Sequence, residues 1–91
     1  MKTFPLIQDP GHAWARVPRK VLISSGCAGS ISNHSMERGN NVYLEQDSDL
    51  QTFIEARNQK GLVTKFAEYT NKSRESRIRR YDSFNYIEGE S

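Results

Sequence analysis

The chain has little that would support chemistry at a fixed site. Its one cysteine, Cys27, excludes an intramolecular disulfide and fits a reducing compartment. It has no apolar run long enough to cross a membrane, and its start lacks the apolar stretch of a signal peptide, so we expect a cytoplasmic protein. Spaced metal ligands, a glycine-rich phosphate loop and a hydrolase nucleophile elbow are also missing, so we expect no metal, no cofactor and no enzyme activity.

The chain is short and its charge is unevenly distributed. Its 91 residues are 35% hydrophobic and 26% charged, which is typical of one small globular domain. The net charge is only +2, but residues 72–80 hold five basic residues and one acidic residue, whereas residues 44–71 hold three basic and five acidic residues. The basic run therefore creates the strongest local field in the sequence.

The stretch 42–54 predicts a strand that leads directly into a helix. Val42 and Leu44 alternate with polar or amphipathic neighbours, as in a half-buried strand. Ser48 is expected to cap the helix, with Gln51 completing a capping box. The apolar residues that follow recur at helical spacing, and Gly61 is suited to the turn that ends the helix. We therefore expect this unit to organise the core.

The whole chain predicts an α+β fold with a single small sheet of about five strands and two helices on one face. We expect residues 1–85 to form one domain and residues 86–91 to be a disordered tail. Pro5 favours an edge strand, because proline cannot donate to a ladder. The expected strands are Thr3–Gln8, His12–Val17, Ile31–Glu37, Val42–Glu45, Leu62–Tyr69 and a short Ser76–Tyr81, and the expected helices are Arg19–Ser25 and Asp49–Lys60.

Three stretches carry a resemblance to a known family: Asp-Pro-Gly-His-Ala-Trp at 9–14, Val-Tyr-Leu-Glu-Gln-Asp-Ser-Asp at 42–49, and Thr-Asn at 70–71 followed by Ser-Arg-Ile-Arg-Arg at 76–80. They resemble a family of small proteins of phages and other mobile elements, whose pattern is Gly-His-Gly-Trp, then Tyr-Leu-Glu-Glu-Asp-Cys-Asp, then Thr-Asn and Ser-x-Ile-Arg. This chain departs from the pattern at Ala13, Gln46, Ser48 and residues 34–36, where the family has an aromatic-Ser-aromatic. The resemblance implies a phage setting but no reaction.

One candidate binding surface lies on the strand face opposite the core. Alternation places His12, Trp14 and Arg16 on that face, and Tyr43 and Glu45 can emerge beside them. Aromatic rings next to an arginine can stack on bases, hold phosphate or anchor a protein partner. The alternative is that Trp14 is a core residue and His12 a turn residue, because tryptophan in small domains is mostly buried.

The second candidate surface is the basic run, with Arg74, Arg77, Arg79 and Arg80, preceded by Asn71 of the Thr-Asn motif. Clustered arginines attract phosphates or an acidic partner in a salt-dependent way. The aromatic residues that follow at positions 81, 84 and 86 strengthen this interpretation. Alternatively, the run is a solvated surface, or it is neutralised within the fold by the acidic segment 44–71.

The carboxylates Glu45, Asp47 and Asp49 are a weaker candidate. Their oxygens suit a hard cation, but no glycine or distal glutamate of a calcium loop follows. Asp49 is explained by the helix dipole alone. Glu45 could act as an acid or base only with His12 or His34 close by, so a catalytic pair stays an alternative.

Together these observations predict a small, non-enzymatic, phage-encoded binding protein. Its most plausible role is an inhibitor of a bacterial defence system, of the anti-CRISPR kind, that occupies a host protein or nucleoprotein surface. Two alternatives stay open: a protein that sequesters a nucleotide signal, and a nucleic-acid-binding regulator. We expect no membrane partner, and an uncovered sheet face would allow a homodimer.

Overall fold

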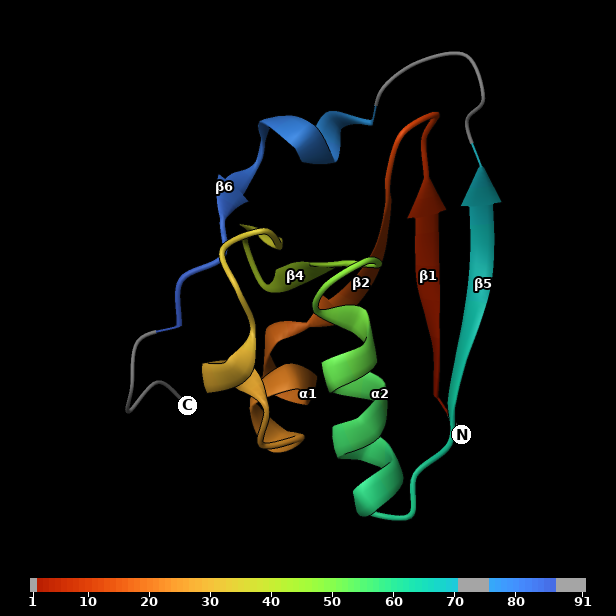
Figure 1. Ribbon diagram of the computed structural model, residues 1–91, viewed down its shortest axis with the longest axis vertical. Coiled ribbons are helices and arrows are strands. Elements are labelled where there is room, and N and C mark those ends of the chain that lie inside the picture. The colour runs from red at the N-terminus through yellow and green to blue at the C-terminus, as the bar shows by residue number, and fades with distance from the viewer. Residues whose placement is uncertain (1, 71–75, 87–91) are drawn as a thin grey trace.

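The computed structural model describes residues 2–70 and 76–86, which form one mixed sheet with two helices packed on it (Figure 1). The strand order is β5-β1-β2-β4-β3-β6; β5 runs parallel to β1, and the other neighbouring strands are antiparallel. The expected α+β class and the two helices on one face are confirmed, with one strand more than the five expected. The elements are β1 (Lys2–Gln8), β2 (Ala13–Pro18), α1 (Arg19–Ser24), η1 (Ala28–Ser30), β3 (Met36–Arg38), β4 (Asn41–Glu45), α2 (Leu50–Gln59), β5 (Thr64–Thr70), η2 (Arg77–Arg80) and β6 (Asp82–Ser83).

Both faces of the sheet bury apolar side chains, but with different partners. We call the side covered by α1 and α2 the helix face and the opposite side the outer face. The main core lies on the helix face, where the ring of Phe53 meets that of Phe4 edge to face at 5.5 Å. Removing such side chains from water is the main source of stability in a domain of this size. The other large members of the main core are Leu6, Val17, Leu22, Val42, Leu44, Leu50 and Phe84.

The alternation predicted for the second strand is confirmed. Ala13, Ala15 and Val17 of β2 are buried in the main core, whereas Trp14 belongs to a second apolar cluster on the outer face. Arg16 shares the parity of Trp14 and is exposed. The pattern of the sequence therefore determines which face each β2 side chain occupies.

The start of α2 differs from the prediction. Its N-cap residue is Asp49 rather than Ser48, and no side chain caps the helix. The hydroxyl of Ser48 donates instead to Glu45, and the Asp49 carboxylate accepts from the backbone and hydroxyl of Ser32 and from the hydroxyl of Ser35. These bonds hold the loop before β3 against α2. The strand expected over residues 31–37 is therefore limited to β3, which starts at residue 36.

Two further predictions about the strands are wrong. Pro5 is not on an edge, because β1 lies between β5 and β2; it is tolerated because the β1–β2 pairing begins only at Leu6. Leu62 precedes β5 rather than belonging to it, and it is exposed. Within residues 2–70 and 76–86, no helix is long and apolar enough to span a membrane.

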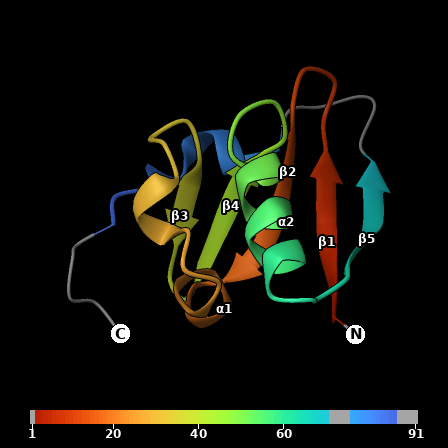
Figure 2. The ribbon, with the colours of Figure 1, turned by 60° about the horizontal axis from the view of Figure 1, so that its bottom comes forward.

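The C-terminal segment is the largest departure from the prediction. Ser76–Tyr81 was expected to be a strand, but Arg77–Arg80 forms a 3-10 helix, η2, whose start is capped by the Ser76 hydroxyl, which accepts from the Ile78 N–H. Figure 2 shows this segment behind the sheet, while the two helices lie in front of it. We call residues 76–84 the C-terminal cover. The short β6 at its end extends the sheet beyond β3.

Candidate functional site

The indole of Trp14 is buried rather than exposed on the surface for a partner. Its relative exposure is 2%, and it packs on the outer face with Tyr43 and Ile78, the last of which comes from the cover. Burial, with a smaller contribution from nearby Tyr81, raises the pKa of Tyr43, and Arg16 opposes that shift. The expectation of a bare outer face is therefore wrong at the centre of the sheet. Trp14 and Tyr43 are core residues there. For Trp14, a place in the core was the alternative that the sequence left open.

A buried carboxylate fastens the cover to the first turn of the chain. Asp9 accepts from the Ser76 N–H at 2.8 Å and from Arg79 Nε and Nη2 at 2.7 and 2.9 Å. It also accepts from the backbone N–H groups of Gly11 and His12. The Arg79 guanidinium, helped by these N–H donors, holds the pKa of Asp9 well below its usual range despite its burial. Asp9 therefore stays charged and fully bonded.

Arg79 is held internally as a result. Its guanidinium lies 5.8 Å from the centre of the Trp14 ring, in addition to its bonds with Asp9. The turn accommodates it closely, because a Cβ on Gly11 would lie only 2.8 Å from Arg79 Nη2. One of the arginines expected to meet a partner thus serves the fold. The sequence left open that an acidic residue within the fold neutralises the basic run. Arg79 is neutralised in this way, but by Asp9 rather than by a residue of the segment 44–71.

Beside this pairing lies a small cleft of about 270 Å³, lined by His12, Trp14, His34, Met36, Glu45 and Arg79. His12 Nδ1 lies 4.0 Å from Glu45 Oε1, so the acid and the imidazole that the sequence suggested are near each other but beyond hydrogen-bond distance. Glu45 is already occupied by the Asp47 N–H and the Ser48 hydroxyl. Among residues 2–70 and 76–86, no group of His, Cys, Asp and Glu could hold a metal ion. The described residues of the cleft therefore contain neither a hydrogen-bonded His–Glu pair nor a metal site.

Five exposed cationic side chains of the described residues lie on the outer face or on the cover. Arg16 and Lys65 lie on the outer face because their strand neighbours, Val17 and Phe66, face the helices. The guanidinium of Arg38 lies 5.0 Å from the centre of the Tyr81 ring, which packs in the outer cluster. We call the set the basic face: Arg16, Arg38, Lys65, Arg77 and Arg80.

The last two members project from the cover itself. Residues three apart eclipse in a 3-10 helix, so Arg77 and Arg80 share a side of η2 that differs from the side on which Ile78 is buried. Both arginines are exposed. In the described part of the chain, none of the five residues of the basic face has a carboxylate within ion-pair distance, whereas Arg19 pairs with Glu37 near the helices. This face is therefore free to attract an external anion.

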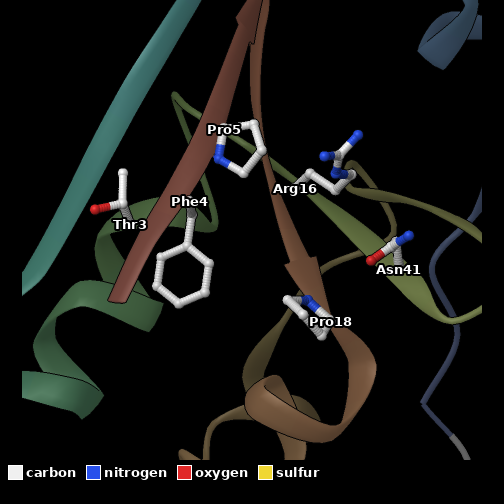
Figure 3. Close-up of a pocket in the computed structure, with 6 residues that line it drawn as sticks. All are labelled: Thr3, Phe4, Pro5, Arg16, Pro18 and Asn41. Atoms are coloured by element: carbon white, nitrogen blue, oxygen red, sulfur yellow. The ribbon is translucent and has the colours of Figure 1, made fainter. Parts of the chain in front are cut away.

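The outer face is least covered over β1 and β5. Tyr69 on β5 is 60% exposed, and alternation places it on the same side as Lys65. A cavity of about 400 Å³ opens where β1 and β2 separate, with Pro5 in the gap, Arg16 extending from β2 and Asn41 from β4 (Figure 3). Thr3, Phe4 and Pro18 complete its lining. The cavity and the exposed tyrosine belong to one side of the molecule.

The structure divides the predicted site residues into three groups. His12, Trp14, Glu45 and Arg79 meet at the cleft; Arg16 stands opposite Tyr43 in the β2–β4 register; and Arg77 and Arg80 are exposed on the cover. Asn71 and Arg74 lie outside the described residues. Of the expected tail 86–91, Tyr86 is described and packs against the main core, and residues 87–91 lie outside the described part of the chain.

Four residues that matter for the site were missed: Asp9, Arg38, Lys65 and Tyr69. Alternation along the predicted strand would have placed Lys65 and Tyr69 together, but no local pattern links Asp9 to Arg79, which lies 70 residues away. No family model, curated protein or solved structure matches this chain. Function is therefore inferred from the residues and their geometry.

Proposed function

We propose that this chain is a small, non-enzymatic binding protein that occupies an anionic surface of a nucleoprotein. The observation that carries the proposal is the basic face, with five exposed cations and no carboxylate partner among the described residues. Clustered cations raise the local concentration of a polyanion and speed its association. Such a face costs stability through self-repulsion, so an external anion is a natural partner.

The resemblance to small phage proteins supports the setting of this proposal. It favours a phage-encoded inhibitor of a bacterial defence system, of the anti-CRISPR kind, that acts in the cytoplasm of the host cell. Occupying a nucleoprotein surface needs a stable scaffold and a charged face rather than catalytic groups. The alternative of nucleotide-signal binding has less support, because Trp14 is buried and Arg79 is bound to Asp9.

The proposal predicts that reversing charge on the cover weakens binding to a polyanion. In the double variant Arg77→Glu with Arg80→Glu, we expect the Kd for a long-chain inorganic polyphosphate to rise by about tenfold or more at low salt, because phosphate contacts are lost and counterion release falls. Titration by calorimetry at two salt concentrations measures both the affinity and its salt dependence. The slope of log Kd against log salt should also decrease.

The matched control is Lys20→Glu with Lys60→Glu, which changes the net charge equally. Both lysines are exposed; Lys20 lies on α1 and Lys60 is the C-cap residue of α2, so neither lies on the outer face. We expect the control to weaken polyphosphate binding by no more than about twofold to threefold. Equal losses in the two variants, or no binding by the unmodified protein at low salt, would contradict the proposal.

A further inference from the structure

We propose that the outer face over β1 and β5 binds single-stranded RNA. This inference rests on the proposed function and names the chemistry of the partner. It is carried by three observations that meet on one side of the molecule: an exposed tyrosine, the cavity between two diverging strands, and the neighbouring cations. Polyanion binding alone needs only the cations, so the tyrosine and the cavity are the additional features.

Tyr69 offers a platform for a base. Its ring is 60% exposed on a strand that forms one edge of the sheet, and Lys65 lies four residues earlier on the same face. An exposed aromatic ring on an open sheet is the usual stacking surface for an unpaired base. Lys65 lies about 13 Å away along the strand, at about 3.3 Å per residue, so it would meet a phosphate of a neighbouring nucleotide. Stacking tolerates any base, so this contact predicts affinity rather than a sequence preference.

The cavity of about 400 Å³ provides the polar contacts. Arg16 on its rim can donate two hydrogen bonds to one phosphate group, and it has no carboxylate partner among the described residues. Thr3 and Asn41 each offer both a donor and an acceptor (Figure 3). Either group suits a ribose 2′-OH, which is itself a donor and an acceptor and distinguishes RNA from DNA. Because β2 lies between β1 and β4, Thr3 and Asn41 would contact different nucleotides.

The arrangement favours a single strand over a duplex. The major groove of B-form DNA admits a projecting helix or a two-stranded ribbon, whereas an RNA duplex presents mainly 2′-hydroxyls and phosphates across a shallow minor groove. Here α1 and α2 lie on the helix face, away from the basic face (Figure 2). A ring exposed on an open sheet surface can stack only on a base that is not already stacked within a double helix.

The test uses fluorescence anisotropy with a labelled ten-nucleotide oligouridylate, the same length of oligodeoxyuridylate, and an RNA duplex. We expect the oligouridylate to bind several-fold more tightly than either of the others. Tyr69→Ala should weaken oligouridylate binding by about tenfold, whereas Tyr69→Phe, which keeps the ring, should change it by less than about twofold. Neither variant should alter polyphosphate binding, because the five residues of the basic face remain.

Three results would overturn the inference: equal binding of Tyr69→Ala and the unmodified protein, equal binding of duplex and single-stranded RNA, or equal binding of the deoxy and ribo strands. Val63→Ala is the matched control, since this exposed apolar residue lies just before β5. If polyphosphate binding depends on Arg77 and Arg80 while oligouridylate shows no advantage, this inference fails and the proposed function stands. If polyphosphate does not bind at all, the proposed function fails first.

Discussion

Replacing Asp9 by alanine is expected to lower the free energy of unfolding by about 3 kcal/mol. The carboxylate is buried and accepts from Arg79 and from three backbone N–H groups, so its removal leaves several donors without an acceptor. Loss of one partner of a buried ion pair costs about 3–5 kcal/mol, and the partial exposure of Arg79 favours the lower figure. Urea unfolding followed by the fluorescence of the single tryptophan measures the change.

The pH dependence of this effect separates charge from packing. The pKa of Asp9 is lowered in the folded state, so its stabilising contribution is complete above its unfolded pKa of about 3.9 and is lost as pH falls toward the folded value. The stability difference between the unmodified protein and Asp9→Ala should therefore stay constant from pH 7 to pH 5 and narrow below about pH 4. Asp47→Ala, which removes an exposed carboxylate, should cost less than about 0.5 kcal/mol. A difference that does not narrow in acid would contradict the ion pair.

Replacing Phe84 by alanine is expected to cost about 3–4 kcal/mol. Phe84 ends the cover, is 4% exposed, and belongs to the main core rather than to the outer cluster. Its N–H donates to the Ser35 carbonyl at 2.8 Å, and the guanidinium of Arg19 lies 5.9 Å from its ring centre. Truncating a buried phenylalanine typically costs 3–5 kcal/mol, against a total stability of about 5–15 kcal/mol for such domains.

Asn85→Ala is the matched control, because the next residue is exposed and should change stability by less than about 0.5 kcal/mol. Thermal or urea unfolding of both variants provides the comparison. If Phe84→Ala were as stable as the control, residues 76–84 would not be anchored at their C-terminal end. Of the two proposed anchors, Asp9 alone would then hold the cover on the sheet.

The sequence was sufficient for the elements whose patterns are local. Alternation placed Val17, Val42 and Leu44 in the core, helical spacing placed Phe53 there, and Gly61, with φ 76°, ends α2 where expected. The element order and the fold class followed from these features. Each depends on contacts that repeat every two or every 3.6 residues.

The cover could not be predicted in the same way. Its 3-10 helix contains one buried apolar residue, Ile78, so it shows no periodicity that would distinguish it from a short strand or a loop. Its position depends on an ion pair between residues 70 apart and on a single phenylalanine. Tertiary contacts of this kind override local preference, and the arginine run gave no sign that Arg79 would turn inward while its neighbours remained exposed.

The candidate site differs from the predicted one because of the same cover. Once the cover encloses Trp14, the aromatic residue available for binding is Tyr69, which the sequence placed on a strand but not in a site. Arg16, Arg77 and Arg80 keep the exposure that their expected role requires. The site therefore combines predicted cations with an unpredicted aromatic ring.

Quenching of Trp14 fluorescence by acrylamide tests the central claim most directly, because the chain has one tryptophan and the cover encloses it. We expect a blue-shifted emission and a quenching constant several-fold smaller in the native protein than in urea. In Asp9→Ala, under conditions where it stays folded, the constant should rise toward the unfolded value. Native quenching as strong as that of the unfolded chain would show that residues 76–84 do not cover the sheet.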